Sequence, residues 1–422
     1  MTDETINIRT TRLPNGAVVI TEFVAGMETA AVGFWTDAGP VDELPCEYGQ
    51  SHFLEHMLFK GTQQRSSYQL AEEIENIGGQ MNAYTERETI HVHVHMLAEH
   101  LPRAIDLMAD MVCRSSFPRA ELEIERQVII EEIRKYDSLP EERIHDLVME
   151  GLWSGGKLGH PILGTEESVK GLDRKALRSC WQRYFAAERV LVTAAGKIDH
   201  DSFVATIAEA FQGLPSSPSA RPIIPDGERR SHVLIEEEGE QVYCCLAGRT
   251  YPARDDRNYP LAVLDTILGG STTSRLFQEV REKRGLAYDI SSYLAGFREA
   301  GLICAAFATG PETFPTVLEI IRREVQRLCR DGVTAQELTR AKEQLKAATA
   351  LSLEGTPDRM QRLAMHFLTW GKVEPVSHLI DRFNRVTPDE INAVLADVFH
   401  LREWTLAAIG PFDAAQIQGL DR

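Results

Sequence analysis

Residues 52 to 56 read His-Phe-Leu-Glu-His, inside the stretch Gly49-Gln-Ser-His-Phe-Leu-Glu-His-Met-Leu-Phe-Lys-Gly-Thr62. On a helix, His52 and His56 project from one face about one turn apart. That spacing lets both imidazoles reach a single metal ion at roughly 2.0–2.1 Å each. Glu55 lies on nearly the same face and could take a proton from a water molecule held there. The pentad therefore predicts a hydrolytic metal site, in the reverse order of the commoner His-Glu-x-x-His.

The residues around the pentad favour a buried helix. We expect Ser51 to cap its N-terminus and Gly61 to end it. The other helical positions are strongly apolar: Phe53, Leu54, Met57 and Leu58. Because buried polar side chains need partners, a metal ion would satisfy the histidines and the glutamate together. The alternative interpretation is an amphipathic helix with two partly buried histidines.

A third metal ligand is expected in residues 121–134, because a catalytic zinc site uses three protein ligands and leaves a fourth position open. Apolar residues recur there with helical spacing. Glu125 and Glu132 are seven residues apart, two turns along one stripe beside the apolar face. Either could point inward, and spacing alone does not choose between them. The other acidic residues are interpreted as solvent-exposed charge: Glu121, Glu123 and Glu131.

Residues 77–96 carry the signal of a strand. From position 89 onward, apolar residues alternate with His91, His93 and His95. We interpret the apolar residues as the buried face, and the histidines as lining a cleft or meeting solvent rather than binding a second metal. Residues 82–85 could form an exposed sheet edge. Such an edge accepts a peptide by strand addition, which depends on backbone more than on sequence.

Several separated motifs resemble the pitrilysin and mitochondrial processing peptidase family, the inverted-motif zinc metallopeptidases. Residues 49–62 resemble the active-site helix of that family. The resemblance continues through residues 78–85 (Gly-Gly-Gln-Met-Asn-Ala-Tyr-Thr) and 125–132, and reappears in residues 276–288 (Leu-Phe-Gln-Glu-Val-Arg-Glu-Lys-Arg-Gly-Leu-Ala-Tyr). It spans nearly the whole chain, and the loop at residues 38–48 is the part less typical of the family.

The resemblance implies a role for each matching residue near the metal. His52, His56 and Glu132 would be the zinc ligands. Glu55 would be the general base that activates water. Glu125 would support the metal site without binding the ion.

The resemblance also implies substrate contacts. Asn82 and Ala83 match a strand that runs beside the substrate and helps to hold the scissile peptide. Arg281 and Tyr288 match a pair from the second domain that closes over the substrate carbonyl. Arginine and tyrosine donors suit the stabilisation of an oxyanion.

Length and charge limit the remaining possibilities. A chain of 422 residues is long for one core and suits two domains of about 200 residues. The net charge of −18 argues against a nucleic-acid partner and weakly favours cationic peptides. The absence of a long apolar run predicts no membrane span. The acidic N-terminus lacks a leader signal, and the seven scattered cysteines suggest reduced thiols, so we expect a cytoplasmic protein.

Two homologous halves are expected. Residues 214–229 are rich in proline, serine and glycine and are interpreted as a linker. They separate a catalytic domain, residues 1–213, from an inactive domain that contributes substrate contacts, residues 230–422. Each half shows a strand, two helices and a further strand, but Leu264-Asp-Thr-Ile-Leu268 replaces the metal motif in the second half. The predicted fold class is α+β, with a mainly antiparallel sheet covered by helices in each domain.

The function expected from these observations is zinc-dependent cleavage of short or unfolded peptides inside a closed chamber. In the family four such domains enclose the chamber, so a two-domain chain implies a dimer. Because both the metal motif and the Arg281–Tyr288 pair are present, a homodimer is expected. The alternatives are a subunit of a heterodimeric processing peptidase, paired with an inactive relative, and a non-catalytic scaffold.

Overall fold

A computed structural model describes residues 7–216, 227–413 and 417. The chain divides into two compact units. Unit 1 contains Met1–Arg134, Pro161–Ile223 and Leu351–Pro375, and unit 2 contains Lys135–His160, Ile224–Ala350 and Val376–Arg422. Each unit is built on one β-sheet with helices against it, which confirms the predicted α+β class.

The sheet of unit 1 has six strands in the order β1-β2-β6-β3-β5-β4. Their bounds are β1 Ile8–Arg12, β2 Val18–Phe23, β3 Thr29–Thr36, β4 Gln80–Thr85, β5 Ile90–Leu97 and β6 Val190–Gly196. Only β2 and β6 run parallel, and the other neighbours are antiparallel. The strand β4 forms one edge of the sheet, as the sequence predicted for residues 82–85.

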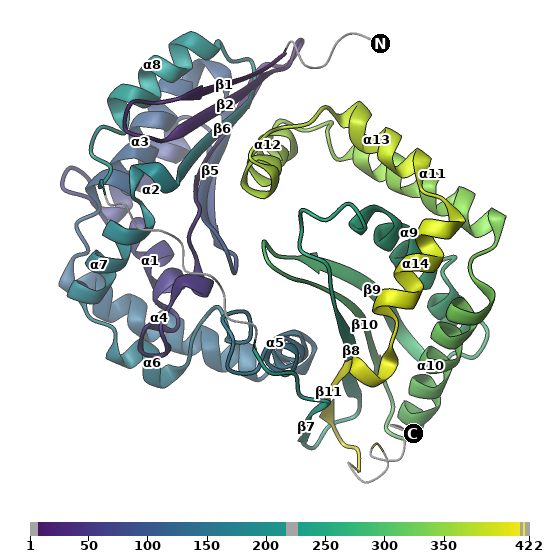
Figure 1. Ribbon diagram of the computed structural model, residues 1–422. Coiled ribbons are helices and arrows are strands. Elements are labelled where there is room, and N and C mark those ends of the chain that lie inside the picture. The colour runs from purple at the N-terminus through teal and green to yellow at the C-terminus, as the bar shows by residue number, and fades with distance from the viewer. Residues whose placement is uncertain (1–6, 217–226, 414–416, 418–422) are drawn as a thin grey trace. The chain divides into compact units, whose positions relative to one another are not determined.

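The helices of unit 1 cover both faces of this sheet (Figure 1). Their bounds are α1 Gln50–Leu58, α2 Ser67–Asn76, α3 Leu101–Arg114, α4 Arg119–Asp137, α6 Glu166–Gly171, α7 Arg174–Tyr184, α8 His200–Ala210 and α12 Thr356–Trp370. Helices α1, α3 and α8 share one core with alternate strand residues such as Val32 and Phe34. The intervening residue Trp35 joins a second core on the opposite face, where α12 contributes Met360 and Leu363.

One glycine explains how closely α12 approaches the sheet. A Cβ at Gly33 would lie only 2.4 Å from Met360 Sδ. Since real atoms do not approach so closely, any side chain at this position would displace the helix. Both faces of the central strands are therefore buried, and β2, β3 and β6 read as almost continuous apolar runs.

The sheet of unit 2 repeats the pairing pattern of unit 1 with five strands, β7-β11-β8-β10-β9. Their bounds are β7 His232–Glu236, β8 Val242–Thr250, β9 Ala287–Gly296, β10 Gly301–Thr309 and β11 Thr405–Gly410. The pair β7–β11 is parallel and the rest are antiparallel, just as β2–β6 is the parallel pair in unit 1. This shared topology supports the duplication inferred from the sequence.

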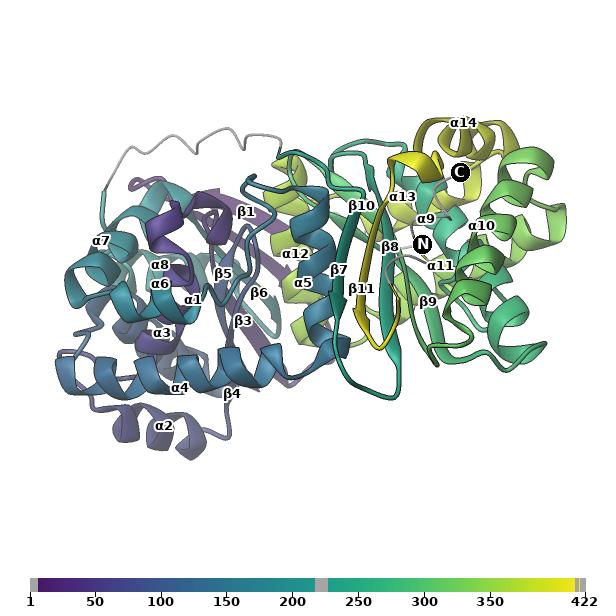
Figure 2. The same ribbon diagram turned by 90° about the horizontal axis from the view of Figure 1, so that it is seen from below.

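The helices of unit 2 are α5 Pro140–Leu152, α9 Asn258–Leu268, α10 Phe314–Asp331, α11 Ala335–Leu351, α13 Val376–Arg385 and α14 Pro388–Val398. Residues Phe277–Glu282 form a π-helical segment. Helix α9 carries the sequence Leu264-Asp-Thr-Ile-Leu268. Helix α5 packs against β7, β8 and β11 (Figure 2).

The compact units differ from the contiguous domains expected from the sequence at two segments. Helix α5 lies before residue 213 but belongs to unit 2, and α12 lies after residue 230 but belongs to unit 1. The physical reason is that each sheet has two apolar faces, and the second face is covered by a helix from the other half of the chain. Most of the expected linker, residues 217–226, lies outside the described residues.

In the described part of the chain, no helix combines the length and the apolar character that crossing a membrane requires.

Candidate metal centre

The helix that carries the pentad is positioned by a buried carboxylate. Glu43 is fully buried and accepts hydrogen bonds from the Gly49 amide (3.0 Å), the Ser51 amide (2.6 Å) and the Ser51 hydroxyl (2.5 Å). A negative charge at this end also complements the helix dipole. The N-cap is Gly49, so the prediction that Ser51 caps the helix was wrong. Ser51 lies within α1 and donates to the acid that holds the helix end.

Gly49 has a backbone conformation that other residues rarely adopt. Its φ is 86°, in the left-handed region. A Cβ there would also lie 2.4 Å from the carbonyl oxygen of Leu163. The sharp entry into α1 therefore requires glycine at this position.

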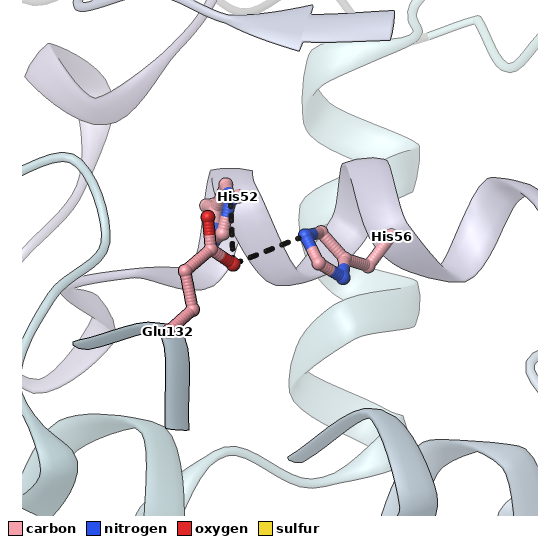
Figure 3. Close-up of side chains that lie close together, drawn as sticks. All are labelled: His52, His56 and Glu132. Atoms are coloured by element: carbon pink, nitrogen blue, oxygen red, sulfur yellow. Dashed lines mark ion pairs between the residues drawn. The ribbon is translucent and has the colours of Figure 1, made fainter. Parts of the chain in front are cut away.

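The side chains of His52, His56 and Glu132 point toward one another (Figure 3). The two histidines come from α1 and the glutamate from α4. Glu132 Oε2 lies 3.8 Å from His52 Nε2 and 3.6 Å from His56 Nε2. Of the residues that the structure describes, this is the group of three whose ligand atoms all lie within 4.8 Å of one another. Glu132, rather than Glu125, thus takes the position expected of the third ligand.

These distances fit a tetrahedral ion. Zinc bound at about 2.0–2.1 Å holds its ligand atoms roughly 3.4 Å apart, close to the separations from Glu132. Burial lowers the pKa of His52 to about 3, with His56 contributing further, so its imidazole is neutral and can donate a lone pair. Its Nδ1 is buried and has no hydrogen-bond partner. Two imidazoles and one carboxylate are a set that zinc prefers.

Glu125 lies behind His56 rather than among the ligands. Its Oε2 is 3.0 Å from His56 Nδ1, and its Oε1 is 2.6 Å from Lys60 Nζ. The carboxylate is almost completely buried. A carboxylate that accepts from the outer nitrogen of a ligating histidine fixes the tautomer and leaves the other nitrogen free for a metal. This arrangement agrees with the supporting role predicted for Glu125.

Lys60 was not among the residues selected from the sequence. It follows His56 by four residues, so helical spacing places both on one side. That spacing was the available signal, but the buried partner Glu125 is 65 residues away in sequence. The ammonium group neutralises a carboxylate that would otherwise be buried as an unpaired charge.

Glu55 is held beside the ligands by a contact to strand β4. The Thr85 hydroxyl donates to Glu55 Oε2 at 2.5 Å. Burial raises the pKa of Glu55, while the hydrogen bond from Thr85 acts in the opposite direction. The site therefore brings one further carboxylate, oriented by a neighbouring strand, to the helix that carries the two histidines.

The residues predicted to contact substrate lie in two places. Asn82 and Ala83 are in the edge strand β4, where Asn82 pairs with His93 and Ala83 with Val92 of β5. In unit 2, the Arg281 guanidinium carbon lies 4.5 Å from the centre of the Tyr288 ring. Tyr288 is 80% exposed. The structure thus places Arg281 and Tyr288 in contact with each other.

Comparison with known proteins identifies the family. The family model described as "Insulinase (Peptidase family M16)" matches residues 18–166, and the model described as "Peptidase M16 inactive domain" matches residues 171–345. The chain belongs to peptidase family M16. The resemblance drawn from the separated motifs is therefore confirmed.

Relatives within the M16 family match over most of the chain. A protein of Streptomyces coelicolor named as an uncharacterized zinc protease is 36% identical, with 98% of this chain and 92% of the relative covered. The zinc protease YmxG of Bacillus subtilis, also named as uncharacterized, is 35% identical, with 94% and 97% covered. The M16 relatives thus carry the name of zinc proteases.

Solved structures show the same fold at lower identity. A protease from Helicobacter pylori superposes with a TM-score of 0.90 at 18% identity, covering 96% of this chain and 99% of that one. A structure from Pseudomonas fluorescens titled as a peptidase M16 inactive domain gives 0.88 at 21% identity, covering 96% and 98%. The M16 fold therefore extends over both units.

Changing Glu125 to glutamine is expected to lower zinc affinity by about 10–100-fold. The amide keeps the shape of the side chain but loses the charge that holds the His56 N–H and pairs with Lys60. Competition with a chromophoric chelator would measure the dissociation constant. Glu123→Gln is a matched control, since Glu123 lies on the same helix and pairs only with Arg126 at the surface. Equal zinc affinity for Glu125→Gln and wild type would contradict the supporting role.

Proposed function

We propose that this chain is a zinc-dependent endopeptidase that cleaves short or unfolded peptides. The observation that carries the proposal is the convergence of His52, His56 and Glu132, with Glu55 on the same helix as the histidines. Membership of family M16 and relatives named as zinc proteases support it.

In this proposal His52, His56 and Glu132 hold the ion. When bound, zinc acts as a Lewis acid that polarises water and carbonyl groups. The neutral imidazole of His52 and the Glu125 contact behind His56 prepare these two ligands before the ion arrives. Little rearrangement is then needed, since the three ligand atoms already lie near one another.

Glu55 is proposed to carry the proton. Its carboxylate takes a proton from the attacking water as the water oxygen bonds to the peptide carbon. It then returns that proton to the nitrogen as the carbon–nitrogen bond breaks, so that one carboxylate and one amine leave. The hydroxyl of Thr85 holds one carboxylate oxygen, which restricts the orientation of the base.

Substrate binding is proposed to involve the edge strand β4. An edge has backbone groups free to pair with an added strand, and Asn82 and Ala83 lie on this strand, near Thr85. By resemblance to the family, we propose that Arg281 and Tyr288 also contact the substrate carbonyl. Their mutual contact would present a guanidinium and a phenol together.

By the same resemblance, we propose a homodimer whose domains enclose a chamber. The alternatives are a heterodimeric processing peptidase and a non-catalytic scaffold. One family description contains the word inactive, but it applies to residues 171–345. The ligands and Glu55 all lie within residues 18–166, matched by the other model. This distribution favours a catalytic chain.

Incubation of the purified chain with a peptide library, followed by mass spectrometry, tests the function. We expect cleavage within peptides, loss of cleavage with a chelator and recovery with added zinc. A chain that binds zinc but cuts no peptide alone would contradict a self-sufficient peptidase. Recovery of cleavage only on adding a second subunit would favour the heterodimer.

A further inference from the structure

A row of aromatic rings crosses three neighbouring strands of unit 1. Trp35 of β3 is directly opposite His91 of β5, and His91 is directly opposite Tyr84 of β4. The ring centres of Trp35 and His91 are 4.1 Å apart, and those of His91 and Tyr84 are 5.3 Å apart. Such cross-strand pairs on one face are the contacts that stabilise a sheet. The rings therefore form a ladder at right angles to the strands.

The inner part of this ladder is dry and uncharged. Trp35 is fully buried and His91 is 4% exposed, so the expectation that all three histidines line a cleft or meet solvent was wrong for His91. Trp35 stacks over its ring and excludes water. Burial lowers the pKa of His91 to about 3, so the imidazole is neutral. An uncharged ring stack suits another ring as its next member.

The ladder ends at the edge of the sheet. Tyr84 is 50% exposed, and its strand pairs with β5 alone among the described strands. The ring of Tyr84 lies parallel to that of His93, with an angle of 12° and a centre distance of 5.7 Å. Asn82 donates to the Tyr84 hydroxyl at 2.8 Å, which fixes the ring. Because one ring face is turned toward His93 on the inner strand, the other face points beyond the edge.

This exposed ring face is adjacent in sequence to the catalytic region. Thr85, the next residue, donates to Glu55. Consecutive residues of a strand are about 3.3 Å apart and point to opposite faces of the sheet. A peptide strand paired with β4 would therefore place a side chain opposite Tyr84 within a residue or two of the bond that faces Glu55.

We propose that the outer face of Tyr84 is a specificity subsite that stacks an aromatic side chain of the bound peptide. This inference rests on the proposed peptidase function and adds the substrate class that the site prefers. The aromatic side chain would be the next ring of the ladder Trp35–His91–Tyr84. Aromatic stacking adds to the affinity gained from burial alone by roughly two- to tenfold.

Paired peptides isolate stacking from hydrophobicity. Each peptide carries one phenylalanine, and its partner carries cyclohexylalanine, which has a similar size but no aromatic face; a third carries arginine. Binding is measured by fluorescence anisotropy to the zinc-loaded Glu55→Gln protein, and cleavage by mass spectrometry with the wild type. We expect phenylalanine to be preferred by roughly two- to tenfold in both measurements, with cleavage close to that residue.

Variants assign the preference to Tyr84. Tyr84→Leu is expected to bring the ratio of phenylalanine to cyclohexylalanine binding to about one. Tyr84→Phe keeps the ring and is expected to keep the ratio, although it loses the Asn82 contact. Tyr68→Leu is the matched control, because Tyr68 is an exposed tyrosine on α2. It should keep the wild-type ratio.

The outcomes separate this subsite from the general function. Equal binding of the phenylalanine and cyclohexylalanine peptides, a preference that persists in Tyr84→Leu, or a preference for arginine would overturn the subsite. So would failure of the Glu55→Gln protein to bind any of the peptides. If the wild type cleaves none of them while the ring preference in binding disappears with Tyr84→Leu, the subsite stands and the peptidase function fails.

Discussion

Glu55→Gln is expected to bind zinc as tightly as the wild type and to cleave peptides about a thousandfold more slowly. The amide has nearly the same shape as the carboxylate and can still accept the hydrogen bond from Thr85. It has no basic oxygen that can take a proton from water. None of His52, His56 and Glu132 is altered, so the zinc content should stay at one ion per chain.

Two measurements on the same preparation decide this prediction. Zinc content by atomic emission shows whether the ligands are intact, and the initial rate on one fluorogenic peptide shows the effect on chemistry. Glu75→Gln provides the matched control, since Glu75 is an exposed glutamate on α2. Cleavage by Glu55→Gln at the wild-type rate would remove Glu55 from the mechanism. Loss of zinc would show instead that Glu55 supports the metal site.

Glu132→Ala is expected to lower zinc affinity by more than about a hundredfold, beyond what the loss of a residue behind a ligand costs. It removes one of three ligand atoms, and only the two imidazoles of α1 remain. Activity should fall with zinc occupancy, and added zinc should restore only a small part of it. Titration with a competing chelator measures the affinity.

The neighbouring residue provides the control for this variant. Glu131 lies on the same helix and forms a surface ion pair with Arg134, and such pairs contribute about 0–1 kcal/mol to stability. Glu131→Ala should therefore keep both zinc and activity. Zinc bound by Glu132→Ala with wild-type affinity would mean that another group completes the site.

The sequence was sufficient for the parts of the site that local spacing controls. Four-residue spacing on a helix brings His52 and His56 together, and their helix α1 forms where the apolar residues predicted it. Spacing did not separate Glu125 from Glu132, because both lie on one stripe of α4. The family resemblance selected Glu132, and the contact of Glu125 with the outer nitrogen of His56 now gives the physical reason.

Features that depend on contacts between distant residues were not predictable. Glu43 replaces Ser51 as the acceptor at the start of α1 because the preceding loop folds back on the helix. His91 is buried because Trp35, which is 56 residues away in sequence, stacks over it. Helices α5 and α12 belong to the units opposite to those expected, since covering a second sheet face depends on three-dimensional packing.

X-ray absorption at the zinc edge of the zinc-loaded protein tests the central claim most directly. The account predicts one zinc ion per chain with two nitrogen ligands from histidine and oxygen as its other neighbours, all at roughly 2.0–2.2 Å. In Glu132→Ala bound to zinc, the two histidine ligands should remain. A coordination shell containing sulfur, or one that has lost no histidine in His52→Ala, would contradict a site built from His52, His56 and Glu132.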